Sequence, residues 1–337
     1  MVNIISNPLS EDLDQILENT RDLWEDIRGK RIFITGGTGF FGCWLLESFA
    51  WANDRLGLNA SALVLTRNED AFRNNSPHLG THPAIQFHMG DIRSFDYPPG
   101  SFAYIIHAAT DSSTQVTIAE TIEAGTRHVL DFACQSGVKK FLLTSSGAVY
   151  SPRPPEMTHI SEEYPTALDP KDLRTNKLLA EEMCINELPG ETKIARCFTF
   201  IGPRLPLDRN FAVGNFIRDG LGGGPIIVRG DGTPLRSYLY ASDLATWLWT
   251  ILFRGESGRP YNVGSDESLS IAEVADQVAQ QFLPHPKVEI KMKSIPGNPA
   301  ESYVPSVQRA QIELGLDKKI DFQASILNTI KWYRLMG

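Results

Sequence analysis

Short apolar segments alternate with longer amphipathic segments between Lys30 and Phe198. Each apolar segment has the length of one strand: RIFIT, ALVLT, IQFHM, FAYII, KKFLL and KIARC. The intervening segments, such as FGCWLLESFAWA and VTIAETIEAGTRHVLDFACQ, carry apolar residues at helical spacing. Because strands that alternate with helices form parallel βαβ units with right-handed crossovers, the pattern predicts an α/β fold built on a doubly wound parallel sheet.

A further helix is expected before the first strand, over residues 10–28. Ser10 is placed to cap it. Apolar residues recur at roughly helical spacing at Leu13, Ile16, Leu17, Leu23, Trp24 and Ile27. We expect this helix to pack on the body of the protein, with a partner-binding arm as the alternative.

Two segments interrupt the alternation. Residues 151–170 contain five prolines, and residues 202–235 are rich in glycine and proline. Ligands of doubly wound sheets bind beyond the carboxyl ends of the strands, and irregular segments commonly carry binding residues. We therefore expect these two segments to form the substrate side of a site.

The charge balance and the cysteines exclude several classes of protein. The chain has 32 Lys and Arg against 40 Asp and Glu, a net charge of −8, whereas nucleic-acid binding favours a basic face. The four cysteines lie far apart, so neither a zinc site nor a dithiol motif is expected. The N-terminus lacks a signal-peptide pattern, and no apolar run is long enough to span a membrane. These features predict a soluble, cytoplasmic protein that binds no metal, membrane or nucleic acid.

A glycine-rich turn follows the first predicted strand, in KRIFITGGTGFFGCWLLES. Gly36, Gly39 and Gly42 stand between strand and helix. In such turns one glycine permits the tight turn, one lets the backbone approach a pyrophosphate, and one allows close packing of the helix on the strand. The N–H groups at the start of the helix then bind phosphate. This context favours a dinucleotide-binding Rossmann domain over residues 30–198, and a tight turn without a ligand is the alternative.

The G-x-x-G-x-x-G spacing resembles that of extended short-chain dehydrogenase/reductases, in the branch of NAD(P)-dependent nucleotide-sugar epimerases and dehydratases. Further matching segments are GDIR, LTSSGAVY, NKLLAEE, RCFTFIGPR, GDGTPLRSYLYASDLA and YNVG. The resemblance implies that Phe40 and Phe41 cover the pyrophosphate and that Asp91 and Ile92 hold the adenine ring. It assigns further cofactor contacts to Gly36, Thr38, Gly39, Gly42, Ala108, Ala109, Thr110, Thr144, Lys177 and Phe198.

The end of the second predicted strand bears on the choice of dinucleotide. In ALVLTRNED, Thr66 and Arg67 stand where NAD-binding proteins carry an acidic residue for the ribose hydroxyls. A guanidinium suits the 2′-phosphate of NADP instead. NADP is therefore favoured, and NAD bound through Glu69 or Asp70 is the alternative.

The resemblance also implies two catalytic residues. Ser146, four residues before Tyr150, would bond the reacting sugar oxygen, and capping of the next segment is its alternative role. Lys177 would hold the nicotinamide ribose and lower the pKa of a nearby phenol. The family carries a catalytic tyrosine four residues before this lysine, but this chain has Leu173, which cannot transfer a proton. Tyr164 or a substrate-bound water is a candidate for this proton transfer. The alternatives are a reaction that bypasses the proton transfer and a protein without catalytic activity.

Gly147 and Ala148 narrow the reaction class. The 4,6-dehydratases of the family carry Asp and Glu at these positions, and its decarboxylases keep a Glu. Neither residue of this chain is an acid or a base. An epimerase or ketoreductase that acts by hydride transfer at a sugar carbon is therefore favoured. A catalytically silent binding protein, and a 4,6-dehydratase with a non-standard acid or base, are the alternatives.

The remaining predictions concern the substrate side. Residues 199–337 are expected to form a smaller α/β region that binds the nucleotide sugar, with 259–264 returning a strand to the sheet and residues 1–29 forming a helical extension. The resemblance implies that Asn215 and Arg236 bind the diphosphate, with Thr199 nearby.

Arginine suits a diphosphate because of its bidentate geometry, and an ion pair with Asp243 is the alternative role for Arg236. A homodimer is expected to form through the helical segments 114–135 and 173–188, although their apolar residues could also serve the core alone.

Overall fold

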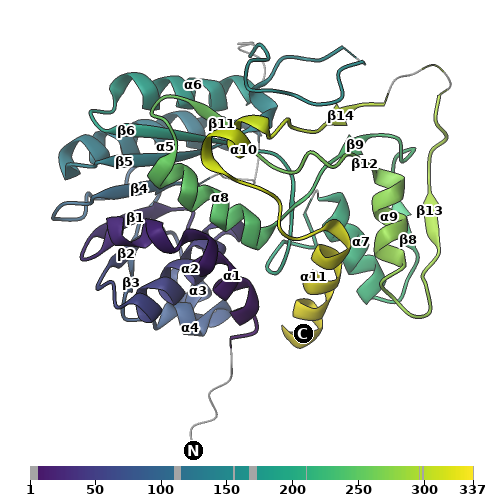
Figure 1. Ribbon diagram of the computed structural model, residues 1–337, viewed down its shortest axis with the longest axis horizontal. Coiled ribbons are helices and arrows are strands. Elements are labelled where there is room, and N and C mark those ends of the chain that lie inside the picture. The colour runs from purple at the N-terminus through teal and green to yellow at the C-terminus, as the bar shows by residue number, and fades with distance from the viewer. Residues whose placement is uncertain are drawn as a thin grey trace, which may run out of the picture. The chain divides into compact units, whose positions relative to one another are not determined.

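The computed structural model describes residues 7–109, 115–154, 156–166, 173–209, 211–295, 297 and 300–336. The chain divides into two compact units, whose elements are labelled in Figure 1. Unit 1 comprises Met1–Tyr150, Pro165–Arg196 and Ala245–Tyr261, and unit 2 comprises Ser151–Tyr164, Cys197–Leu244 and Asn262–Gly337.

Unit 1 is built on a seven-stranded sheet with the order β11-β6-β5-β4-β1-β2-β3. Its strands are β1 (Arg31–Thr35), β2 (Ser61–Thr66), β3 (Ile85–Met89), β4 (Tyr104–His107), β5 (Lys140–Ser146), β6 (Glu191–Cys197) and β11 (Pro260–Val263). β1 pairs in parallel with β2 and β4, β2 with β3, and β4 with β5. The chain winds outward from β1 to β3 and then returns to β4 on the other side of β1, which confirms the predicted doubly wound Rossmann-type sheet.

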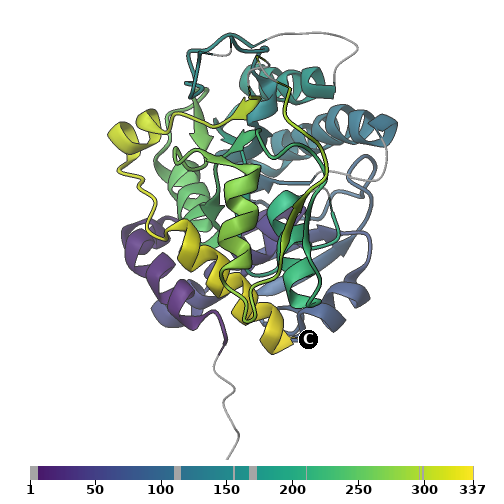
Figure 2. The same cartoon turned by 90° about the vertical axis from the view of Figure 1, so that its right-hand side faces the viewer.

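Helices cover both faces of this sheet (Figures 1 and 2). The helices that belong wholly or mainly to unit 1 are α1 (Ser10–Thr20), α2 (Phe40–Leu56), α3 (Glu69–Asn75), α4 (Pro77–Gly80), α5 (Gln115–Ser136), α6 (Leu173–Glu187) and α8 (Ala241–Arg254), with the 3-10 helices η1 (Arg21–Ile27) and η2 (Gly147–Val149). α5 packs against α6, and α1 against α2. Because the sheet is covered on both faces, β1 and β4 are almost entirely buried, which explains their nearly continuous apolar sequences.

The core of unit 1 is rich in aromatic residues. Phe33 of β1 lies with its ring centroid 4.8 Å from that of Phe132 of α5 and 5.4 Å from that of Phe95. Leu130 and Leu143 are buried in the same cluster. This packing holds β1 in place, and β1 leads directly into the glycine-rich turn.

The leading helix forms, but it begins differently from the prediction. Ser10 is the first helical residue and does not cap the helix. The Asn7 side chain instead accepts a hydrogen bond from the Leu9 N–H at 2.9 Å, and the Asn7 carbonyl accepts one from the Ser10 N–H. An Asx turn before the helix has therefore replaced a serine cap. All six apolar residues predicted for this segment are buried, consistent with packing on the body of the protein.

Unit 2 contains small sheets and four helices among its described residues. The strands are β7 (Phe200–Ile201), β8 (Ile226–Val228), β9 (Leu235–Arg236), β10 (Leu239–Tyr240), β12 (Leu269–Ser270), β13 (Val288–Ile290) and β14 (Ser302–Tyr303). They form the sheets β10-β7, β12-β9-β14 and β13-β8. The helices are α7 (Ala212–Leu221), α9 (Ile271–Ala279), α10 (Gln308–Leu314) and α11 (Phe322–Met336). Within the described ranges, no helix is long and apolar enough to cross a membrane.

Candidate active site

The three glycines of the turn after β1 have separate structural roles. Gly36 has φ +70°, and a Cβ there would lie 2.5 Å from the Ala108 carbonyl. At Gly42, a Cβ would lie 2.3 Å from the Gly36 oxygen, so only glycine lets α2 start this close to the turn. At Gly39, the nearest atom to a Cβ would be 3.4 Å away, which is ordinary contact. The fold therefore requires Gly36 and Gly42, whereas the absence of a side chain at Gly39 leaves the backbone open to a ligand.

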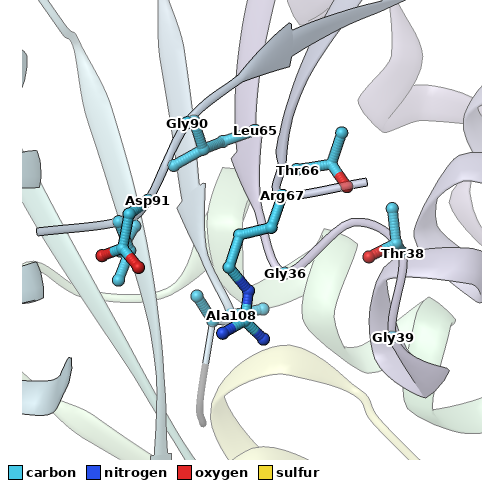
Figure 3. Close-up of a pocket in the computed structure, with 11 residues that line it drawn as sticks. Gly36, Thr38, Gly39, Leu65, Thr66, Arg67, Gly90, Asp91 and Ala108 are labelled. Atoms are coloured by element: carbon cyan, nitrogen blue, oxygen red, sulfur yellow. The ribbon is translucent and has the colours of Figure 1, made fainter. Parts of the chain in front are cut away.

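A pocket lies beside this turn, at the carboxyl ends of the central strands (Figure 3). Its lining residues are Gly36, Thr38, Gly39, Leu65, Thr66, Arg67, Gly90, Asp91, Ile92, Ala108 and Ala109. Of the predicted cofactor residues, Phe40 and Phe41 form the first turn of α2, and Thr110 lies outside the described residues. Leu65 and Gly90 also line the pocket, although the sequence motifs did not predict them as cofactor contacts. Their positions at or beyond the ends of β2 and β3 could have indicated this.

Arg67 reaches into the pocket. Figure 3 shows its side chain extending from the end of β2 toward Ala108. Glu69, one of the acids considered for an NAD ribose, instead forms an ion pair with Arg73 at 2.6 Å in α3. Neither Glu69 nor Asp70 lines the pocket. The charge at this end of β2 that faces the pocket is therefore positive.

Asp91 lies on another wall of the pocket with an arginine partner of its own. The Arg93 guanidinium donates to both carboxylate oxygens, at 2.8 and 3.1 Å. These hydrogen bonds hold the pKa of Asp91 below its ordinary value. Asp91 is therefore an anionic acceptor, and its partner Arg93 is a residue that the sequence motifs did not single out.

Buried polar side chains connect the ends of β1 and β4. His107 Nδ1 lies 2.8 Å from Thr35 Oγ1, and its Nε2 lies 3.2 Å from Thr126 Oγ1. Burial lowers the pKa of His107 to about 3, and the charge of Lys177 contributes to the shift. His107 is therefore neutral near pH 7 and acts as a fixed hydrogen-bonding link between the strand ends that line the pocket.

Ser146 and Lys177 lie at the carboxyl end of β5. The Lys177 ammonium donates to the Thr144 carbonyl at 3.4 Å, which brings the start of α6 next to this strand end. Ser146 is the last residue of β5, and its Oγ accepts a hydrogen bond from the Ala148 N–H at 3.1 Å. Ser146 therefore caps η2, the structural role considered for it. The backbone of Leu173 begins α6 four residues before Lys177.

A buried ion pair supports this serine. The Arg196 guanidinium donates to the Glu181 carboxylate at 2.7, 3.1 and 3.2 Å, and both side chains are less than a tenth exposed. Ser145 donates to the same carboxylate, and the Arg196 guanidinium lies 4.9 Å from the centre of the Tyr150 ring. Burial acts against the charge of Arg196, but the Glu181 hydrogen bonds and charge outweigh it and raise the pKa of Arg196. The pair therefore holds residues on both sides of Ser146, a role that no sequence motif indicated.

Three of the predicted substrate residues, Thr199, Asn215 and Arg236, belong to unit 2, whereas Ser146 belongs to unit 1. The Thr199 hydroxyl donates to the Ser237 carbonyl, and the Asn215 side chain accepts from Arg218 at 3.0 Å in α7. Arg236 forms an ion pair with Glu301 at 3.0 Å. The alternative pairing of Arg236 with Asp243 is wrong, because Asp243 instead accepts the N–H groups of Lys319 and Ile320.

Two further predicted residues of unit 2 make contacts within that unit. Phe198 is buried, with its ring centroid 4.8 Å from that of Tyr303. The Tyr164 phenol donates to the Pro152 carbonyl at 2.9 Å. Among the described residues, no group of three or more His, Cys, Asp or Glu side chains is arranged to hold a metal ion.

The family model described as "NAD dependent epimerase/dehydratase family" matches residues 32–264. This range is more than half of the chain, so the protein belongs to that family, as the sequence motifs predicted. UDP-glucuronic acid decarboxylase 1 of Arabidopsis thaliana is 27% identical over 318 residues, which cover 90% of this chain and 70% of that relative. UDP-glucuronic acid decarboxylase 1 of Xenopus tropicalis is 28% identical over 319 residues, with coverages of 90% and 72%.

Solved structures show the same fold. UDP-glucuronic acid 4-epimerase from Bacillus cereus, in complex with UDP-glucuronic acid and NAD, superposes with a TM-score of 0.76 at 20% identity over 91% of this chain and all of that one. A dTDP-glucose 4,6-dehydratase double mutant from Streptomyces venezuelae gives a TM-score of 0.76 at 22% identity, over 90% of this chain and 97% of that one. At these identities the likeness establishes the fold.

Proposed function

We propose that the protein is a cytoplasmic enzyme that epimerises or reduces the sugar of a nucleoside diphosphate sugar by hydride transfer at a sugar carbon. The observation that carries the proposal is the arrangement in unit 1, where Lys177 bonds to the end of β5 that also bears Ser146. The same unit contains the glycine-turn pocket. The names of the relatives, which include decarboxylases and an epimerase of UDP-glucuronic acid, support a nucleotide sugar as the substrate.

The residues around the glycine turn fit a nicotinamide dinucleotide. The open backbone at Gly39 and the start of α2 suit a pyrophosphate, because N–H groups and the helix dipole there favour negative charge. When bound, the dinucleotide supplies the hydride acceptor or donor. Lys177 would bind its nicotinamide ribose, and Asp91 and Ile92 would bind its adenine. Arg67 would bind a 2′-phosphate, so we propose that NADP is preferred to NAD.

The proton chemistry differs from that of the family, because Leu173 cannot act as an acid or base. Ser146 would donate a hydrogen bond to the sugar oxygen on which charge develops, and this interaction strengthens in the transition state. Tyr164 is a candidate for the proton transfer, although in this structure its phenol donates to the Pro152 carbonyl. The presence of Leu173 specifically favours the second candidate function, a binding protein for dinucleotide and nucleotide sugar without turnover.

A product assay separates these two functions. The protein is incubated with NADP, NADPH, NAD or NADH and a panel of nucleotide sugars that includes UDP-glucuronic acid, and the sugars are analysed by NMR. We expect at least one sugar to be converted. Ser146→Ala should lower kcat by about 10-fold or more with little effect on binding, whereas Ser101→Ala, at an exposed serine of unit 1, should have no effect. Binding without any conversion would identify the protein as a silent binder.

The dinucleotide site can be tested separately through two glycines. Gly39→Val should lower dinucleotide affinity at least about 10-fold without lowering the Tm, because the side chain enters the ligand's space rather than the fold. Gly42→Ala is the control for structural damage, since its Cβ would collide with the backbone of the turn and should lower the Tm. Titration calorimetry and thermal unfolding give the two readouts. Unchanged affinity in Gly39→Val would contradict the assignment of the site.

We also propose a homodimer formed through α5 and α6. These helices pack side by side, and Ile185 of α6 is 43% exposed. Two residues further along α6, Glu187 forms an ion pair with Arg127 of α5 at the surface. Light scattering at micromolar concentration should give twice the monomer mass, and a monomer mass would mean that these helices serve the core alone.

A further inference from the structure

Two arginines of unit 2, Arg153 and Arg236, lie on segments that are far apart in the sequence but run side by side in the structure. β9 and β14 pair in parallel, with Arg236 opposite Tyr303. The proline-rich segment runs alongside β14, where the Ile160 N–H donates to the Val304 carbonyl at 2.9 Å. Ser302 of β14 donates to the Thr158 carbonyl of the same segment at 3.2 Å. These contacts bring the segment that carries Arg153 to the strand pair that carries Arg236.

The carboxylate of Glu301 contacts the Arg236 guanidinium, and its charge also acts on that of Arg153. Arg236 donates to Glu301 at 3.0 Å and to the Leu235 carbonyl at 2.9 Å. Arg153 has a buried NH1 group with no hydrogen-bond partner among the described residues. Burial lowers the pKa of Arg153, and Arg236 lowers it further, while Glu301 and the phenols of Tyr164 and Tyr303 act in the opposite direction. The cluster thus carries one excess positive charge and one unsatisfied donor.

An anionic ligand would complete this cluster. A buried N–H donor without an acceptor is unfavourable, and two like charges close together add to that cost. A diphosphate supplies two negative charges and several acceptor oxygens, and the planar donors of arginine match phosphate oxygens with paired hydrogen bonds. A single carboxylate would offer fewer acceptors and only one charge.

We infer that Arg153, together with Arg236, binds the diphosphate of the nucleotide sugar. This inference deepens the proposed function and rests on it. Arg153 comes from the proline-rich segment, which carries none of the predicted diphosphate ligands. It gives that segment a specific binding role in addition to its structural one.

The test measures binding by titration calorimetry with UDP, TDP, GDP and CDP, with inorganic pyrophosphate as a probe of the diphosphate alone, and with the tightest ligand's monophosphate. Arg153→Met should weaken binding of the tightest diphosphate by about 10- to 100-fold, the usual effect of losing charge-assisted hydrogen bonds. The corresponding monophosphate should be affected less. Arg153→Lys should retain part of the affinity, and Arg229→Met, at an exposed arginine of unit 2, should retain all of it.

The outcomes separate this inference from the proposed function. Equal affinity in Arg153→Met and the wild type would overturn the role of Arg153 but not the enzyme assignment, which the NMR panel tests. Binding of none of the diphosphates by the wild type would also overturn the inference. An arginine with only a structural role would lower the Tm on replacement by Met. We expect an unchanged or higher Tm, because the variant removes a partly buried charge with a buried N–H donor that has no acceptor among the described residues.

Discussion

The buried Glu181–Arg196 pair provides a stringent test of how the active-site serine is held. Arg196→Met removes the partner of a carboxylate that is almost fully buried, and leaves it with the Ser145 hydroxyl. Breaking a buried pair on one side costs about 3–5 kcal/mol, because an uncompensated charge stays in the interior. A loss of this size corresponds to a decrease in Tm on the order of 10 °C for a unit of this size.

The double variant isolates the cause. If the loss arises from the unpaired charge, Arg196→Met combined with Glu181→Leu should recover most of the lost stability, because replacing both ions of a buried pair by apolar residues is often nearly neutral. Because each single variant leaves one unpaired buried charge, the double-mutant cycle should then give a coupling energy of at least about 3 kcal/mol. Thermal and urea unfolding, followed by tryptophan fluorescence, provide the measurement.

The same variants report on catalysis. Since Ser145 bonds to Glu181 and Tyr150 lies against Arg196, loss of the pair should loosen both sides of Ser146 and lower kcat more than it raises KM. The reasoning would be refuted if Arg196→Met changed the unfolding free energy by less than about 1 kcal/mol, far below the range for a buried pair. Destabilisation in the double variant equal to the sum of the two single ones would refute it as well.

Three further predictions concern the cofactor, the fold and the missing phenol. Arg67→Ala should weaken NADP binding more than NAD binding, and equal effects in calorimetry would show that Arg67 is only a surface charge. Burial raises the pKa of Asp243 from 3.8 to about 6. The stability gained by keeping this carboxyl protonated is therefore fully present below about pH 4, and about 3 kcal/mol of it is lost as the pH rises through 6. Asp243→Asn, which keeps an acceptor for Lys319 and Ile320, should therefore gain stability relative to the wild type between pH 4 and 6 in urea unfolding, and a constant difference would contradict the assigned pKa. Leu173→Tyr should raise kcat if the missing phenol alone limits turnover, whereas a rate that falls or stays the same in the product assay would show that another group has taken its role.

The alternation of apolar and amphipathic segments was sufficient to predict the doubly wound sheet. Buried parallel strands need continuous apolar sequences, and the helices between them need one apolar face. The local periodicity of apolar residues therefore indicates the fold class. The glycine-rich turn could also be recognised, because its residue type and its place between strand and helix reflect backbone geometry. The sequence alone could not show which glycines of the turn are required by the fold and which one leaves space for a ligand. Those roles depend on the position of Ala108, directly after the neighbouring strand β4, and on how closely α2 approaches the turn.

The tertiary structure determined which charged residues pair when they are far apart in the sequence. Glu181 and Arg196 lie on different elements, α6 and β6, and no local spacing relates them. Arg236 pairs with Glu301 rather than Asp243 because β9 and β14 are neighbours in a sheet. The hydrogen bonds at the start of the first helix are accepted by Asn7 rather than by the Ser10 side chain, because the side chain and the carbonyl of Asn7 both reach N–H groups there. Residue type and spacing therefore determined which chemistry the chain carries, whereas strand pairing and burial determined which charges meet, because such contacts depend on distances in space rather than along the chain.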